Sequence, residues 1–154
     1  MIPSLTTRRN ALRLALAGAA LPLLGSLSAR AATGPSVAVW QDPTCGCCQG
    51  WVRHMRQAGF NVMVHFTSDM GAIKQARGVP DDMQSCHTAV IDGYIVEGHV
   101  PAPDIVRLLG DRPDAKGLAV PGMPASAPGM DQPGQPYDVM VFGTPAGDRI
   151  YASH

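Results

Sequence analysis

The sequence predicts an α/β domain that follows an export signal, and three observations support this. Apolar segments with strand-like and helix-like periodicity alternate from Ser36 to Leu109. Asp92-Gly93 separates two apolar runs, which is the strongest short-range signal for a tight β-hairpin. The dense cysteine motif Cys45-Gly46-Cys47-Cys48 stands at the junction of the first strand and the first helix. These features together indicate a compact mixed fold with chemistry at one strand end.

The order of the elements follows from these patterns. We expect strands over residues 36–40, 61–66, 86–91 and 94–99, and helices over residues 47–58, 70–77 and 101–109. Gly59 and Gly78 are placed to end the first two helices, and a proline-rich turn opens the third. The order β-α-β-α-β-β-α, with cysteines after the first strand, is the outline of a thioredoxin-like fold.

The remaining C-terminal segment predicts an extension of this fold. Residues 111–136 are rich in Pro, Gly, Ala and Met, and we expect them to form a loop without a core of its own. Residues 137–142 and 149–152 are expected to form a terminal hairpin.

Residues 1–31 predict an export signal. Arg8 and Arg9 precede an apolar run over residues 14–27, and Ala29-Arg30-Ala31 provides a small-residue cleavage site. The paired arginines are typical of a twin-arginine signal, although an ordinary secretory signal is the alternative. Either route predicts a periplasmic domain of residues 32–154, which the twin-arginine route would carry across already folded.

The charge of this domain excludes some partners. The four arginines of the signal leave eight basic residues against twelve acidic ones in residues 32–154. A net charge near −4 argues against nucleic acid and anionic lipid, since both require a basic surface. No segment after the signal is apolar and long enough to span a bilayer, so no stable membrane insertion is expected.

The cysteines predict reactivity or metal binding. Cys45, Cys47, Cys48 and Cys86 remain after cleavage, and an even number in an exported protein favours disulfides. A bond between the adjacent Cys47 and Cys48 would close a strained ring. At most a Cys45–Cys48 bridge and one long-range bridge to Cys86 fit normal geometry. Thiolates are favoured at a helix N-terminus, and crowded sulfur ligands select Cu(I), zinc or iron–sulfur clusters.

The hairpin adds histidines to this set. Pairing across Asp92-Gly93 places Cys86 opposite His99, with both side chains on one face of the strands. Strict alternation points His87 to the other face, although strand ends often depart from it, so His87 stays a candidate. In a thioredoxin layout the third strand begins beside the cysteine motif, so these groups converge. The candidate metal ligands are Cys45, Cys47, Cys48, Cys86, His87 and His99.

Several motifs in order resemble one family. They are Cys-Gly-Cys-Cys-x-x-Trp at 45–51, Gly-Val-Pro at 78–80, Ser-Cys-His-Thr-Ala at 85–89, Gly-Tyr-x-Val-Glu-Gly-His-Val-Pro at 93–101 and Gly-Leu-Ala-Val-Pro-Gly-Met-Pro at 117–124. Over nearly all of the mature chain the sequence resembles the CopG-like copper-resistance family of exported metal-binding proteins. The resemblance implies a thioredoxin-like fold and a copper centre, with several copper ions bridged by Cys45, Cys47, Cys48 and Cys86. It further implies periplasmic copper handling, a redox change between Cu(I) and Cu(II), and other periplasmic copper-handling proteins as partners.

Three functions remain open at this point. The first is a copper-binding and redox protein, with copper oxidoreductase turnover undecided. The second is a thiol–disulfide oxidoreductase of the thioredoxin class, which Cys47 disfavours because exchange needs only two thiols. The third is a structural zinc domain. It is disfavoured because a structural zinc site normally has two separated ligand pairs, whereas here three cysteines share one helix start. Whether the thioethers of Met123 and Met130 also bind the metal is left open by the sequence.

Overall fold

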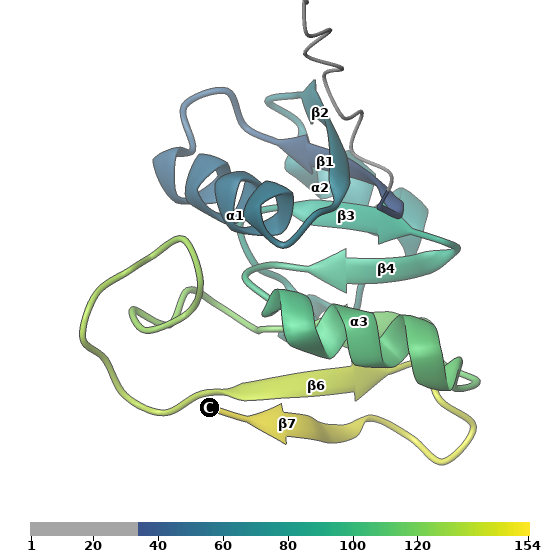
Figure 1. The fold of residues 1–154 in the computed structure, drawn as a ribbon. Coiled ribbons are helices and arrows are strands. Elements are labelled where there is room, and N and C mark those ends of the chain that lie inside the picture. The colour runs from purple at the N-terminus through teal and green to yellow at the C-terminus, as the bar shows by residue number, and fades with distance from the viewer. Residues whose placement is uncertain (1–33) are drawn as a thin grey trace, which may run out of the picture.

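The computed structural model describes residues 34–154, so the predicted export signal at residues 1–31 lies outside the described part. This part folds into a mixed seven-stranded sheet with three α-helices and a short 3-10 helix (Figure 1). Among these residues no helix combines the length and apolar character that crossing a membrane requires.

The elements agree closely with the expected order up to the third helix. The strands are β1 (Ser36–Gln41), β2 (Asn61–Phe66), β3 (Thr88–Ile91), β4 (Tyr94–Glu97), β5 (Gly117–Ala119), β6 (Asp138–Phe142) and β7 (Arg149–Ser153). The helices are α1 (Gly46–Gln57), α2 (Met70–Arg77), the 3-10 helix η1 (Asp81–Met83) and α3 (Ala102–Asp111).

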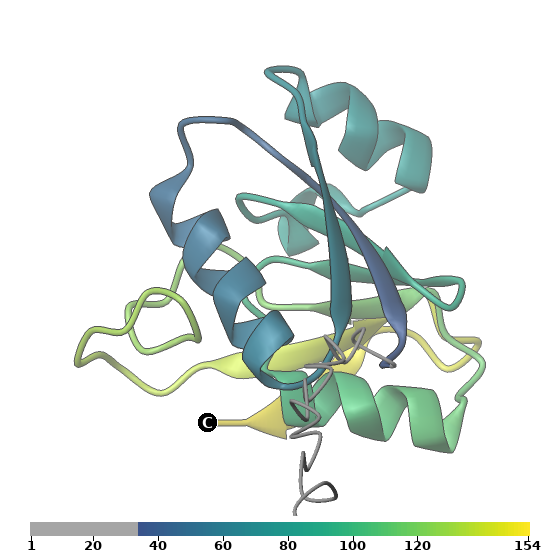
Figure 2. The same cartoon turned by 45° about the horizontal axis from the view of Figure 1, so that its top comes forward.

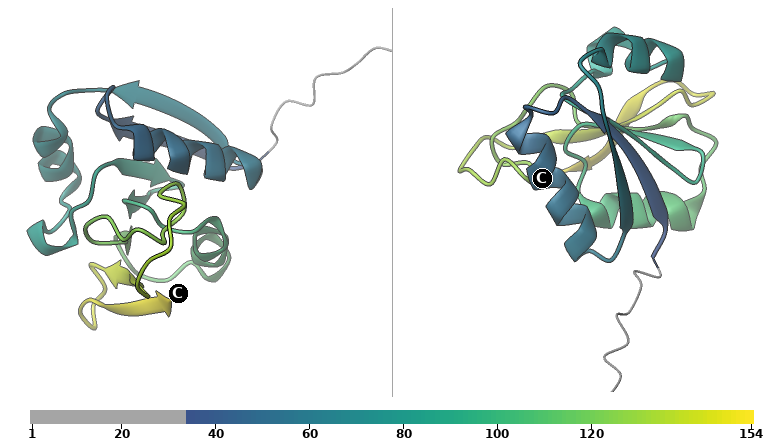
Figure 3. Two further views of the ribbon diagram at one scale, coloured as in Figure 1. Left: turned by 90° about the vertical axis from the view of Figure 1, so that its left-hand side faces the viewer. Right: turned by 90° about the horizontal axis from the view of Figure 1, so that it is seen from above.

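The sheet has the strand order β2-β1-β3-β4-β5-β6-β7. The pairs β1–β2 and β4–β5 are parallel, and all other neighbours are antiparallel. Helices α1 and α3 cover one face of the sheet, and α2 lies on the other face (Figures 1 and 3).

The main core lies beneath α1 and α3. Trp51 and Met55 of α1 and Ile105 and Leu108 of α3 are fully buried against the sheet. Their spacing of three or four residues matches the helical period, so each helix buries one apolar face. A smaller cluster on the second face contains Val79, Met83, Ile95, Ala119 and Phe142.

Local capping fixes where α1 and α2 begin. The Sγ atom of Cys45 accepts a hydrogen bond from the Cys48 N–H at 3.4 Å, so the cysteine motif itself caps α1. Asp69 caps α2 through the Ala72 N–H, and Gly78 ends α2 in the left-handed conformation with φ 63°.

The register predicted for the β3–β4 hairpin is confirmed. Asp92 and Gly93 have φ values of 49° and 88°, as a type I′ turn requires. The pairs run from Ile91–Tyr94 to Thr88–Glu97. Both strands are shorter than expected, but the Gly98 N–H still donates to the His87 carbonyl at 2.9 Å, which extends the same register by one step.

The prediction of a coreless extension is wrong in one respect. Gly117–Ala119 forms β5, which joins β4 to β6, and the terminal hairpin β6–β7 continues the same sheet. A Cβ atom on Gly117 would lie 1.8 Å from the Ile95 carbonyl oxygen, so only glycine permits this close pairing. A three-residue strand offers too little periodicity to be recognised from sequence.

Candidate metal centre

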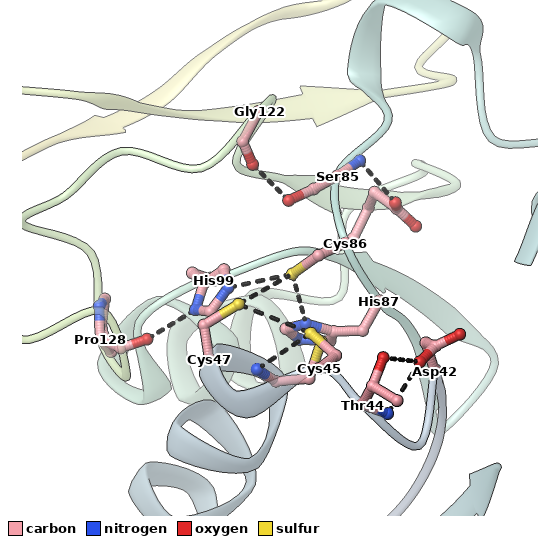
Figure 4. Close-up of a disulfide and its surroundings, with 12 residues drawn as sticks. Asp42, Thr44, Cys45, Cys47, Ser85, Cys86, His87, His99, Gly122 and Pro128 are labelled. Atoms are coloured by element: carbon pink, nitrogen blue, oxygen red, sulfur yellow. Dashed lines mark hydrogen bonds between the residues drawn. A yellow bond between two sulfur atoms is a disulfide. The ribbon is translucent and has the colours of Figure 1, made fainter.

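Three segments bring the predicted ligands together. Cys45, Cys47 and Cys48 stand at the start of α1, Cys86 and His87 directly precede β3, and His99 follows β4. Figure 4 shows dashed lines from the sulfur of Cys86 to the sulfur of Cys47 and to both histidine rings. Strand ends and a helix N-terminus thus meet at one edge of the sheet.

Two of the cysteines form a disulfide in this structure. Cys45 is bonded to Cys48, whereas Cys47 and Cys86 are free thiols. Cys48 is fully buried, and Cys45 is partly exposed. The pairing is the short-range bridge that the sequence allows, and it leaves two thiols available for a metal.

Cys86 is the centre of the cluster. Its Sγ atom lies 3.1 Å from His99 Nε2, 3.3 Å from His87 Nδ1 and 4.0 Å from Cys47 Sγ. Cys47 Sγ lies 3.5 Å from Cys45 Sγ. Two groups of donor atoms, each within 4.8 Å of one another, therefore share Cys86: the four cysteines, and Cys86 with His87 and His99.

His99 is oriented by the loop between β5 and β6. Its Nδ1 lies 2.8 Å from the Pro128 carbonyl oxygen, which can only accept, so Nδ1 carries the proton. The lone pair is then on Nε2, which faces Cys86. Burial also lowers the pKa of His99, and a neutral imidazole is the form that binds metal.

The position of His87 corrects the alternation argument. His87 lies in the same cluster as His99, because it precedes β3 and is free of the strand's alternation. Its ring is fully buried, with its centroid 4.5 Å from that of Trp51 and 5.0 Å from that of His99. Burial lowers the pKa of His87 well below its usual value, and the neighbouring His99 and Lys74 add to this shift. Its Nε2 is buried and has no hydrogen-bond partner within the described part of the chain.

Cys86 is held as a thiol in the metal-free protein. Burial raises its pKa to about 12, and the nearby Cys47 adds to the rise. A bound cation would reverse this preference, since metals bind the thiolate and displace its proton.

A buried charged network supports the Cys86 segment, and the sequence did not predict it. Glu97 of β4 accepts hydrogen bonds from the Ser85 N–H at 2.8 Å and from Thr88 Oγ1 at 2.6 Å, and it forms an ion pair with Lys74 of α2. Burial raises the pKa of Glu97, while the hydrogen bonds from Lys74 and Thr88 oppose the rise. The sequence does contain one signal for this network, which is a glutamate at the end of an apolar strand. Glutamate is rarely buried without a partner, so a buried Glu97 requires a basic or hydrogen-bonding group beside it.

The loop from residue 120 to residue 137 closes on the start of α1 (Figures 1 and 2). Gly50 and Gly129 make the contact possible: a Cβ on Gly129 would lie 2.3 Å from the Trp51 nitrogen, and one on Gly50 would lie 2.4 Å from the Gly129 oxygen. The Ser85 hydroxyl also donates to the Gly122 carbonyl. The loop therefore braces both the motif helix and the Cys86 segment.

His54 and His65 lie outside this cluster and have structural contacts of their own, whereas the role of Met123 and Met130 is still a prediction. His54 Nε2 accepts the Ala102 N–H at 3.0 Å and so caps α3, and His65 stacks on Trp40 with ring centroids 5.1 Å apart. Met123 has 59% of its surface exposed, and ligation by Met123 or Met130 stays a prediction.

The donor set suits a soft metal ion. The Cys86 thiol lies beside two neutral imidazoles and 4.0 Å from the Cys47 thiol, and the buried Nε2 of His87 has no hydrogen-bond partner among residues 34–154. Thiolate and imidazole together are typical ligands of copper and zinc. Carboxylates, which hard cations require, are absent from both donor groups within residues 34–154.

Comparison with known proteins identifies relatives. A family model described as "Protein of unknown function, DUF411" matches residues 83–130, the segment that contains Cys86, His87 and His99. Two solved structures of copper resistance protein CopG, Form 1 and Form 2, are each 44% identical to this chain. Each superposes with a TM-score of 0.73 over 79% of this chain and 98% of the solved chain. No match was found among curated proteins.

Proposed function

The chain belongs to the family of the copper resistance protein CopG, and on that premise we propose that it binds copper in the periplasm and serves copper resistance. The observation that carries the proposal is the position of Cys86, whose sulfur lies within 4.0 Å of another thiol and of two neutral imidazoles. Such a set of soft donors is suited to Cu(I).

The disulfide gives the site two donor sets. With the Cys45–Cys48 bond formed, the free donors are Cys47, Cys86, His87 and His99. Reduction takes up two electrons and two protons and adds two thiols beside them. Copper is the cargo here, and crowded thiolates can each bridge two Cu(I) ions, so the reduced site would hold several ions. The redox state of the pair would thereby set the copper capacity.

The fold assignment and location belong to the same proposal. The order β2-β1-β3-β4, with the cysteine motif between β1 and α1, supports a thioredoxin-like core to which β5, β6 and β7 are added. The signal-like residues 1–31 support export, with the twin-arginine route as the expected one.

The replacement Cys47→Ser tests the proposal. Reduced parent and variant are loaded with copper and zinc both present, and bound metal is measured after removal of the excess. We expect several copper ions per chain in the parent, fewer in the variant, and an intact ability of the variant to form the Cys45–Cys48 disulfide. Thr44→Ala is the matched control, since Thr44 is exposed and its side chain bonds to Asp42 alone among residues 34–154. Equal copper in parent and variant would exclude Cys47 as a ligand.

A second function, thiol–disulfide exchange, is favoured by one observation. The Cys45–Cys48 disulfide lies at a helix N-terminus, with Cys45 more exposed than Cys48, as attack on an accessible sulfur requires. Reduction of a disulfide substrate by the Cys86→Ser variant separates the two functions. An exchange enzyme would keep its rate in that variant, whereas a copper protein would lose copper.

A further inference from the structure

A groove between α1 and β2 is not used by the cluster. It has a volume of about 490 Å³, and α1, β2 and the end of β1 supply its walls. Its lining includes Gln41, Val52, Arg53, Arg56, Val64 and Phe66. The groove thus combines two basic side chains with an apolar floor.

The two arginines are available to a ligand. Within residues 34–154 Arg53 makes no ion pair or hydrogen bond, and Arg56 donates only to the Val62 carbonyl, at 3.1 Å. The other basic residues of this part are engaged. Lys74 pairs with Glu97, Arg77 lies over Trp40, Arg107 over Tyr151, Arg112 pairs with Asp92, Lys116 donates to Gly78 and Arg149 to Thr144. Arg53 and Arg56, three residues apart in α1, therefore place two positive charges beside the groove that no acidic side chain of residues 34–154 neutralises.

The apolar floor and one buried amide complete the groove. Phe66 has 61% of its surface exposed although it lies beside the largely buried Val52. Gln41 is 1% exposed, and its buried Oε1 makes no hydrogen bond within residues 34–154, so one wall of the groove holds a polar atom without a partner.

The groove adjoins the cysteine motif. Gln49, which directly follows Cys48, belongs to its lining. Gln41 pairs with Phe66 in the parallel register of β1 and β2, and it lies four residues before Cys45. A molecule bound in the groove would therefore be next to the start of α1.

We propose that this groove docks an acidic segment, carrying an apolar side chain, of a protein that exchanges copper with the cluster; this rests on the proposed function. The carboxylates pair with Arg53 and Arg56, and the apolar side chain packs on Phe66. Arginine and aromatic residues are enriched at such interfaces. The domain as a whole is acidic, with eight basic residues against twelve acidic ones in residues 32–154. Only a local basic site attracts an acidic partner to such a domain.

The experiment uses the metal-free, disulfide-bonded protein and a capped peptide of alternating glutamate and leucine. Binding is followed by amide chemical-shift changes at low ionic strength. We expect shifts at Gln49, Arg53 and Phe66, and affinity at least about tenfold weaker in the double variant Arg53→Ala/Arg56→Ala, as loss of charge-assisted bonds predicts. Phe66→Ala should weaken binding without changing its salt dependence.

Three controls make the test decisive. The double variant Arg112→Ala/Arg149→Ala changes the net charge equally and should bind like the parent; an equal loss would show nonspecific attraction and overturn the proposal. A peptide with glutamine in place of glutamate should not bind. Sodium propionate that binds as tightly as the peptide, or no binding of the peptide at all, would also overturn it.

Copper loading separates this proposal from the function on which it rests. Arg53→Ala/Arg56→Ala should keep the parent's copper stoichiometry, because neither arginine is in the donor groups. Failure of peptide binding with normal copper loading would refute only the docking site.

Discussion

The Sγ atom of Cys86 lies 3.1 Å from Nε2 of His99, and the Asp92-Gly93 turn, which begins six residues after Cys86 and ends six residues before His99, sets this contact. The two residues flank β3 and β4 and follow the register that Asp92 and Gly93 impose. A shift by one residue would move one of the two side chains to the other face of the hairpin.

The first prediction concerns this turn. Gly93→Val should lower the free energy of unfolding by about 1–2 kcal/mol, because a β-branched residue is strained at φ 88°. Urea denaturation of the metal-free protein measures the loss. Gly110→Ala in α3 is the matched control, since its new Cβ would lie more than 4 Å from every described atom outside the adjoining backbone of α3, and it should stabilise by about 0.5–1 kcal/mol. A Gly93→Val variant as stable as the parent would contradict the role of the turn.

The second prediction concerns the Cys86 thiol. Its pKa of about 12 means that in the folded, metal-free protein it is almost entirely protonated at pH 8, and only the thiolate reacts with iodoacetamide. Alkylation of Cys86 should therefore be slow in the folded protein and fast in urea, as peptide mass spectrometry can show.

The same shift fixes the sign of the pH dependence of stability. The pKa of Cys86 is higher in the folded chain than its ordinary value of 9.0. Its contribution to stability is therefore present below about pH 9 and is lost as the pH rises towards about 12. Cys86→Ser should lack this alkaline loss; equal alkaline loss in the parent and the variant would assign it to another group.

The third prediction concerns the ion pair of Lys74 and Glu97. Glu97→Gln leaves a buried ammonium without its counter-charge and should cost about 3–5 kcal/mol of stability. Lys74→Met/Glu97→Met should recover most of that loss, since an apolar pair needs no compensation. The double variant lacks the acceptor of the Ser85 N–H, so its copper stoichiometry should be lower than that of the parent even though its stability is restored. Normal copper loading there would show that the network serves stability alone.

The fourth prediction concerns the contact of the loop with α1. Gly129→Ala should release the loop, because its Cβ would lie 2.3 Å from the Trp51 nitrogen. Hydrogen exchange should then increase over residues 125–132, and His99 should lose its bond to Pro128. Gly122→Ala is the control: it has a similar φ of 69° but meets no atom within 4 Å, so it carries the backbone strain without the clash. Equal exchange in both variants would attribute the effect to backbone strain.

The sequence predicted the parts of the site that depend on local rules. The Asp92-Gly93 turn fixed the partner of Cys86, and glycine and capping residues placed the ends of α1 and α2. Strict alternation did not apply to His87, because it holds only inside a strand and β3 begins one residue later, at Thr88. The roles of Pro128 and Lys74 depend on tertiary contacts between distant segments, for which a single sequence carries no periodic signal.

The hydrogen bond from His99 to Pro128 joins residues that are 29 positions apart in the sequence. The metal centre therefore depends on a segment that supplies none of its six candidate donors. All six candidate donors are contained in the stretch from Cys45 to His99, so a designer could copy every one of them into a shorter scaffold. That copy would lack the Pro128 carbonyl, which selects the tautomer of His99. It would also lack Gly129, whose close contact with α1 holds this carbonyl in place. Such a graft would keep the composition of the centre while losing its preorganisation, and weaker, less selective metal capture is the expected result.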